Sequence, residues 1–464
     1  MRASIQRLRS EGGFSLLELL IAMLIAIEIL VAAAIAFDVH NRAAVVQTQI
    51  TDLQQSLRVA QYDMARLVRM AGRGGLPPLQ RPDFDFTPAT HLLSGVAIEV
   101  RNNVTGGDRN IARGVVGSPL AVEGTDILTV RGCFANPVYQ LEPDAFLPTD
   151  GSTPPDGIAD GSVTFVVRPA SVAGIPQPTE PLIEQLEVPG TNPLMVFLSP
   201  VSRLIYGVGR VTDYDDTGDL QITVDVTPGS AWESLDPWVD QPPAPPTRGM
   251  PAAMSAALTC VLEEYRYYVQ QVHEIPGNAA TPLRPRLTRA RFEPGTEAAY
   301  AGDPANYALD LADGVFDLQI ALGFDSDYPS VGGSAPGSFD DDLDVLGNDD
   351  LIFEAAAGTP GRATDDWLYN DSGDNPDADE WRRHQFLGRL PGQEVHLYYL
   401  RLTTVARTSR PDPSYQAPDF DTTVGSDWIE DHNYDLPPAR DFKSEENRKF
   451  RRRMLTTVIE MRNI

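Results

Sequence analysis

The stretch FSLLELLIAMLIAIEILVAAAIAF occupies residues 14–37 and contains no Pro, Gly, Lys, Arg or His. As a helix, these 24 residues rise about 36 Å, which is enough to cross a hydrocarbon core about 30 Å thick. Only two carboxylates, Glu18 and Glu28, interrupt the apolar run. The stretch therefore predicts a helix that spans a membrane once.

Charge on either side of this stretch predicts its orientation. Arg2, Arg7 and Arg9 precede it against one acid, Glu11. Because positive charge stays on the cytoplasmic side, we expect the N-terminus inside and everything after residue 37 outside the cytoplasm. A secretory signal peptide would place small residues after the apolar run, whereas the chain continues there with DVHNR at 38–42.

The small residues lie before the run instead, as Gly12 and Gly13. The segment GGFSLLE at residues 12–18 resembles the class III leader of type IV prepilins. This resemblance implies that a prepilin peptidase removes residues 1–13 by cutting between Gly13 and Phe14, and that the new N-terminus at Phe14 is methylated. It also implies that Glu18 assembles subunits by pairing with the N-terminal amine of a neighbour. The alternative is an ordinary signal anchor in which Glu18 is merely tolerated near the interface.

Helical periodicity continues beyond the membrane half. Apolar residues recur at helical spacing at Ile50, Leu53, Leu57, Ala60, Met64 and Leu67, flanked by polar residues such as Arg58 and Gln61. No Gly or Pro occurs from residue 14 to residue 71, and GRGG at 72–75 then ends the pattern. The sequence predicts one helix over 14–71, with an amphipathic half at 38–71 and a linker at 72–85.

The period changes after residue 85, and the remaining chain, 86–464, predicts a large β-rich domain. Short β-branched or alternating runs predict strands at 96–101, 126–131, 162–168, 194–198, 203–211, 219–226, 257–270, 316–323, 395–406 and 454–462. Turn-rich stretches near 136–200, 241–251 and 325–380 predict insertions. The expected fold class is α+β: a long N-terminal helix followed by a mainly antiparallel β domain with long loop insertions.

Four further segments carry a closer family resemblance: DMARLVRMAG at 63–72, GTDILTVR at 124–131, DLQIALGFD at 317–325 and RRRMLTTVIEMRN at 451–463. They resemble the PilW-type minor pilins. The resemblance implies a structural subunit that primes pilus assembly or sits at the pilus tip. Its implied partners are the prepilin peptidase, other minor and major pilins and the inner membrane, with the C-terminal domain periplasmic until the subunit enters the filament. Alternatives are a minor pseudopilin of type II secretion, or a tip adhesin with a calcium-binding acidic region.

Two cysteines, Cys133 and Cys260, each follow a strand-like run. Because the predicted compartment is oxidising, we expect a disulfide between them, with two buried free thiols as the alternative. A tetrahedral metal site is not expected, since two thiols lack the His partners it needs.

Acidic residues are concentrated between residues 325 and 380. Asp371, Asp374, Asp377 and Asp379 are the candidate ligands for Ca²⁺, which prefers carboxylate oxygens. The alternative is a solvated loop that charge keeps soluble. The basic stretch at 448–453 has two interpretations as well: it protects a sheet edge, or it contacts DNA or the acidic surfaces of other subunits.

Overall charge and the absence of catalytic motifs limit the remaining functions. With 37 basic against 65 acidic residues, the net charge is −28, which disfavours generic nucleic-acid binding. The six histidines are dispersed, and no nucleophile elbow, phosphate loop, zinc-binding helix or dinucleotide fingerprint occurs. The sequence predicts a protein that is not an enzyme and needs no cofactor other than the Ca²⁺ considered above.

Overall fold

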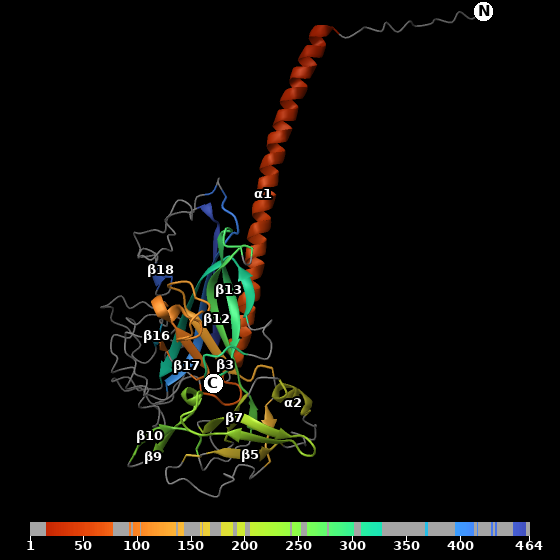
Figure 1. Ribbon diagram of the computed structural model, residues 1–464. Helices are drawn as coiled ribbons and strands as arrows, with labels where there is room; N and C mark the ends of the chain where they lie inside the picture. Colours follow the sequence, from red (N-terminus) through yellow and green to blue (C-terminus); the bar gives the residue numbers. More distant parts are fainter. Residues whose placement is uncertain are drawn as a thin grey trace, which may run out of the picture. The chain divides into compact units, whose positions relative to one another are not determined.

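The computed structural model shows one long helix and a β-rich remainder (Figure 1). It describes residues 15–77, 92–93, 96–102, 104–135, 138–142, 158–159, 161–167, 178–188, 193–199, 205–241, 244–251, 258–275, 278–300, 308–326, 367–369, 395–412, 415, 428–429, 432–433 and 449–460. The fold class is α+β, as the sequence predicted, with an apolar N-terminal helix followed by mainly antiparallel strands.

Helix α1 runs without interruption over Leu16–Met70. The chain divides into two compact units between Asp52 and Leu53, so α1 belongs to both. In the first unit, every helical residue from 16 to 45 is exposed. In the second unit, α1 buries one stripe, which consists of Leu53, Leu57, Ala60, Gln61, Met64, Ala65, Leu67 and Val68. The apolar stripe predicted from the sequence is therefore the buried face of the helix.

The first sheet contains six strands in the order β1-β2-β3-β12-β13-β14 among the described residues, and every pair is antiparallel. Their bounds are Leu92–Leu93, Ile98–Arg101, Ile127–Gly132, Glu263–His273, Leu283–Phe292 and Ala308–Asp313. The loop between β2 and β3 contains the short 3₁₀ helix η1, Gly106–Arg109. Strands β12 and β13 form the longest hairpin of this sheet and pair from His273↔Leu283 to Glu264↔Phe292.

The second sheet is inserted between β3 and β12 and has the order β4-β11-β6-β7-β8-β5. The bounds are Tyr139–Gln140, Leu258–Val261, Leu194–Leu198, Tyr206–Asp215, Gln221–Asp225 and Ser162–Val166. An antiparallel bridge between Leu141 and Val167 joins its two edges, so the sheet closes on itself around its own apolar cluster. Helix α2, Glu180–Leu186, adds Leu182 and Leu186 to that cluster. We call this unit the closed sheet.

The third sheet has the order β16-β15-β17-β20, with bounds Trp367–Tyr369, Val315–Ser326, Val395–Arg407 and Arg452–Glu460. The chain passes from β14 of the first sheet into β15 at Gly314, whose φ is +79°. A Cβ there would lie 2.4 Å from the carbonyl oxygen of Arg407. Glycine is therefore required at this corner, both for its backbone conformation and for the close approach.

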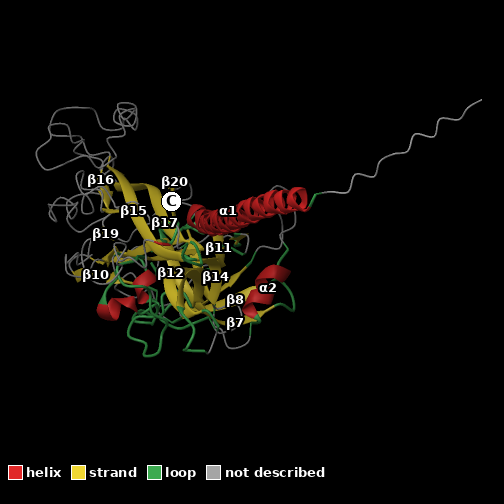
Figure 2. Cartoon of the chain, turned by 90° about the horizontal axis from the view of Figure 1, so that it is seen from above, coloured by secondary structure: helices red, strands yellow, loops and turns green. Residues whose placement is uncertain are grey.

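The main core lies between α1 and the sheets. One apolar cluster contains the buried stripe of α1 together with residues from the first sheet, such as Val130 and Leu287, and from the third sheet, such as Leu402 and Ile459. Figure 2 shows α1 with β17 and β20 in the view from above. The C-terminal part of α1, from Leu53 onward, is thus part of the core of the second unit.

Every strand predicted from the sequence is present, although the run at 257–270 divides into β11 and β12. The remaining elements are η2 (Glu233–Leu235), β9 (Trp238–Gln241), β10 (Ala244–Arg248), β18 (Trp428–Ile429) and β19 (His432–Asn433). The sequence reasoning did not predict β13, β14 or the β9–β10 pair. Pro285 and four arginines obscure the apolar alternation of β13, and β10 lies in the Pro-rich stretch expected to be an insertion.

Candidate functional site

The predicted processing site lies outside the described residues, whereas the predicted assembly residue lies within them. Gly13 and Phe14 are not described, whereas Glu18 lies in the first turn of α1 and is exposed. Glu18 is surrounded by exposed apolar side chains, including Leu17, Leu19 and Leu20. A carboxylate near the helix N-terminus is stabilised by the helix dipole in water. In a bilayer it needs a partner, because hydrocarbon does not solvate charge.

The C-terminal half of α1 is fixed to the third sheet by Gln61. The Gln61 Nε2 group donates to the Thr404 Oγ1 atom at 2.9 Å and to the carbonyl oxygen of Leu455 at 2.7 Å. The Thr457 hydroxyl donates in return to Gln61 Oε1. Gln61, which the sequence placed among the flanking polar residues, is only 4% exposed. That placement was wrong because the third sheet supplies partners that local periodicity does not show.

Asp63 fixes the same half of α1 to the first sheet. Its carboxylate accepts two hydrogen bonds from Arg289 Nη1, at 2.8 and 2.9 Å, and one from the Tyr267 hydroxyl at 2.9 Å. Burial and the Asp63 carboxylate raise the pKa of Tyr267 well above its usual value, although Arg289 opposes this. The hydroxyl therefore remains a donor. Together, Gln61 and Asp63 set the rotation of α1 against both sheets.

The turn after α1 packs on the disulfide. Cys133 and Cys260 are bonded, which is the pairing expected from the sequence. Gly74 has a φ of +105°, and a Cβ there would lie 2.5 Å from the Cys260 Sγ atom and 2.7 Å from the Cys133 Sγ atom. The N–H of Cys133 donates to the carbonyl of Arg73 at 3.0 Å. The start of the stretch expected to be a linker, 72–85, is therefore packed structure, and its part beyond residue 77 lies outside the described residues.

The disulfide also joins the two points where the chain enters and leaves the closed sheet. Cys133 directly follows β3, where the chain leaves the first sheet, and Cys260 lies in β11, just before the chain returns as β12. The bond thus joins both ends of the insertion, and the turn that follows α1 packs against it at Gly74. Their separation of 127 residues corresponds to about 4–5 kcal/mol of stability in the loop-entropy account.

A chain of alternating charges, buried along its centre and accessible to solvent at both ends, lies on the first sheet, and the sequence reasoning missed it. Its members, in order of contact, are Arg113, Glu99, Arg131, Glu264, Arg266 and Glu297. Burial raises the pKa of Glu99, but Arg113 and Arg131 outweigh this and lower the pKa to about 2. The signal in the sequence was an Arg or Glu inside otherwise apolar strands, such as Arg131 in ILTVRG. The chain joins β2, β3 and β12 to the loop after β13 and is structural.

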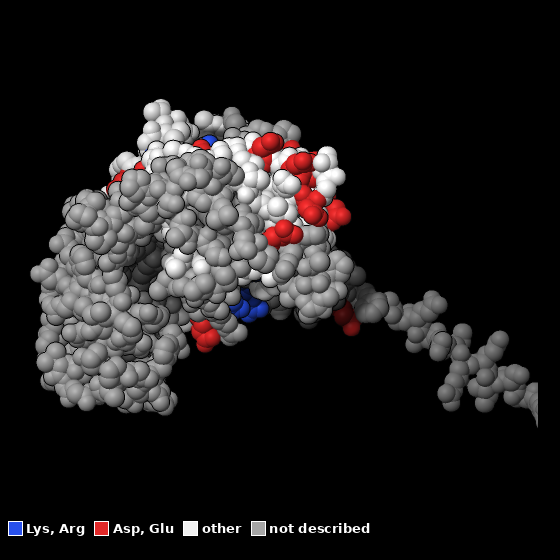
Figure 3. Space-filling model, turned by 90° about the horizontal axis from the view of Figure 1, so that it is seen from below, with Lys and Arg blue, Asp and Glu red and all other residues white. Residues whose placement is uncertain are grey.

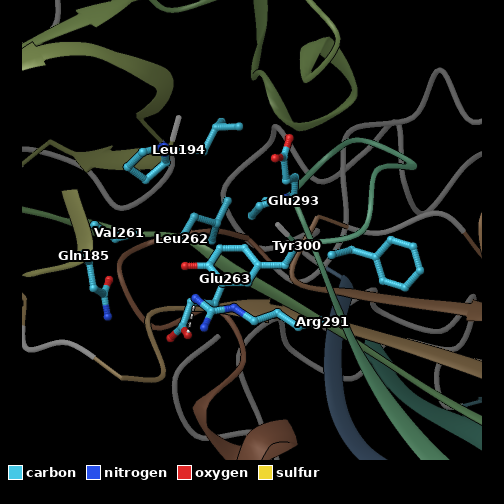
Figure 4. A pocket seen from close by; sticks show the side chains of 11 residues that line it. Gln185, Leu194, Val261, Leu262, Glu263, Arg291, Glu293 and Tyr300 are labelled. Carbon is cyan, nitrogen blue, oxygen red and sulfur yellow. Dashed lines mark ion pairs between the residues drawn. The ribbon is translucent and has the colours of Figure 1, made fainter. Parts of the chain in front are cut away.

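A small cavity lies where the closed sheet meets the first sheet (Figure 4). Leu194, Val261 and Leu262 supply apolar walls, and Arg291 pairs with Glu263 at 3.0 Å while lying against the Tyr300 ring. The cavity volume is about 20 Å³, which is room for a water molecule or two rather than for an organic substrate.

Asp371, Asp374, Asp377 and Asp379 all lie outside the described residues. Within the described part of the chain, no group of three or more His, Cys, Asp or Glu side chains is arranged to hold a metal ion. In the view from below, one group of described acidic side chains lies at the upper right, others are scattered over the same face, and few described basic side chains are visible (Figure 3).

Comparison of the chain with protein-family models, with curated proteins and with solved structures finds no match. By length and composition, α1 is apolar enough to cross a membrane, and none of its apolar window is buried in the protein. Further along the same helix, Gln61 and Asp63 bond to the sheets.

Proposed function

We propose that this chain is a minor type IV pilin, a structural subunit that is stored in the membrane and enters a filament through α1. The observation that carries the proposal is the division of α1, whose apolar N-terminal half is exposed and whose C-terminal half buries one stripe against the β domain. Exposing so much apolar helix to water is strongly unfavourable, so it requires lipid or other helices around it.

Two sequence features make a filament subunit a better proposal than an ordinary anchored protein. The Gly-Gly-Phe junction at 12–14 resembles a prepilin leader, and Glu18 stands at the fifth position after it. Removal of the leader would create a positive amine at Phe14. That amine on one subunit and Glu18 on its neighbour are complementary charges in an environment where neither is well solvated.

Leader processing gives the first test. Mass spectrometry of the native protein should find Phe14 as the methylated N-terminal residue. Gly13→Leu should block processing, because the peptidase would no longer find its small residue, whereas Gly12→Ala serves as the matched control and should be processed. Retention of residues 1–13 in cells with an active prepilin peptidase contradicts the proposal.

Assembly gives the second test. Glu18→Gln should leave the protein in the membrane but strongly reduce its recovery in sheared surface filaments. Deleting the gene should lower the number of surface filaments. Normal filaments in the deletion strain, together with a loss of protein secretion, would instead favour the secretion pseudopilus.

A further inference from the structure

Glu28 lies in the middle of the exposed apolar half of α1. It follows Phe14 by 14 residues and precedes Phe37 by nine, so it lies about 21 Å and 14 Å along the axis from the two ends of the run. Its carboxylate is carried on only two methylenes and does not reach either interface from this depth. If α1 spans the membrane as proposed above, Glu28 must find its partner inside the hydrocarbon.

The helix itself supplies no such partner. The positions one turn away, Leu24, Ile25, Val31 and Ala32, are all apolar. The nearest basic residue along α1 is His40, 12 residues away, or about 18 Å along the axis. Arg42 lies further still and pairs with Asp38 at 2.8 Å. Glu18 and Glu28 also lie about 80° apart around the helix, so one neighbouring group does not serve both.

A second copy of this chain supplies no basic side chain at that depth either, because residues 14–37 contain no Lys, Arg or His. We therefore infer that Glu28 binds a basic side chain on the transmembrane helix of a different protein, at about the depth of the bilayer midplane. Ala32, one turn further along the same face, has a small side chain that lets the partner helix approach closely. The ion pair then selects a heteromeric neighbour, whereas Glu18 is left for the amine of a pilin subunit.

Site-specific photo-crosslinking in the native host tests this. A benzophenone amino acid replaces Ala32, about 40° from Glu28 on the same face, or Leu30, about 160° away, as the matched control. Each position is combined with native Glu28, with Glu28→Gln, which keeps shape but removes charge, and with Glu28→Asp, which keeps charge. Because Glu28→Gln is less polar, it does not impair insertion, and alkaline extraction of membranes verifies that each variant remains membrane-bound.

The expected result is a discrete adduct from position 32 and not from position 30. Mass spectrometry should identify a protein with Lys, Arg or His within a transmembrane segment. Glu28→Gln should reduce the adduct about tenfold, as expected for the loss of one interhelical polar contact, and Glu28→Asp should retain most of it. Glu28→Lys combined with a carboxylate at the partner's basic position should restore the adduct.

Three results would overturn the inference. These are an undiminished adduct in Glu28→Gln, which means a neutral carboxyl suffices; adducts only with copies of this chain; and no difference between positions 32 and 30. The inference rests on the membrane anchoring in the proposed function, but different experimental results would contradict the inference and the proposed function. Release of the protein by alkaline extraction, or retention of residues 1–13, counts against the proposed function, whereas the three results above arise in a protein that remains anchored.

Discussion

A methyl group on Gly74 probes the packing of the turn after α1 on the disulfide. Gly74→Ala places a Cβ 2.5 Å from one sulfur and 2.7 Å from the other, at a φ of +105°. The backbone conformation costs about 1–2 kcal/mol for an L-residue, and overpacking against the buried disulfide adds about 1–3 kcal/mol. We expect Gly74→Ala to lower the free energy of unfolding by about 2–5 kcal/mol.

Urea unfolding of the detergent-solubilised full chain, followed by tryptophan fluorescence, measures this loss, and thiol titration verifies that the disulfide has formed. The decisive comparison repeats Gly74→Ala in a Cys133→Ala/Cys260→Ala background, where the sulfurs are absent. The cost of about 1–2 kcal/mol for the backbone conformation should remain there, together with the contact of the added Cβ with Val196 Cγ1 at 3.0 Å. Gly117→Ala is the matched control, because Gly117 has a φ of +86° and no atom within 4 Å of the added Cβ. Its cost should be equal in both backgrounds. An equal cost for Gly74→Ala in both backgrounds would refute the packing argument.

Three other changes test contacts in the second unit. Asp63→Asn should lower stability by about 2 kcal/mol, since the Arg289 and Tyr267 donors lose their charged acceptor, and hydrogen exchange should accelerate over residues 53–70; unchanged exchange there would contradict the anchoring role. Glu99 has a pKa lowered to about 2 despite its burial, so its contribution to the free energy of unfolding is present above about pH 4.5 and is lost as the pH falls towards 2. We expect this contribution to be about 3 kcal/mol. Glu99→Gln should make the free energy of unfolding nearly independent of pH over that range. Burial and Glu233 raise the pKa of Asp236 to about 8. The contribution of Asp236 to the free energy of unfolding is therefore fully present below about pH 4, where the carboxyl is neutral in both the folded and the unfolded protein, and it is lost as the pH rises through 8. Asp236→Asn should therefore stabilise the protein at pH 7, by at most about 4 kcal/mol, and parallel pH profiles for the two proteins would contradict this.

The sequence predicted the long helix, its buried stripe and the core strands because each is a local pattern. An apolar run of membrane length and a 3.6-residue period are readable from neighbouring residues alone. Strand β13 was missed because Arg284, Arg286, Arg289 and Arg291 suggest a solvated segment, whereas in the structure they pair with acids from other elements. Asp63, one of those acids, lies on α1 more than 200 residues earlier.

The sequence by itself determined that residues 14–37 are suited to lipid and that the helical period continues beyond them, and it predicted the pairing of two cysteines that the structure shows. These conclusions depend on composition and spacing, which folding does not change. Only the tertiary structure showed that β4–β8 and β11 close into a separate sheet and that the disulfide joins the two ends of this insertion next to Gly74. It also showed that Gln61 is a core residue. The physical reason is that each depends on contacts between segments distant in the chain, where a polar side chain becomes buried only when another element supplies its hydrogen bonds.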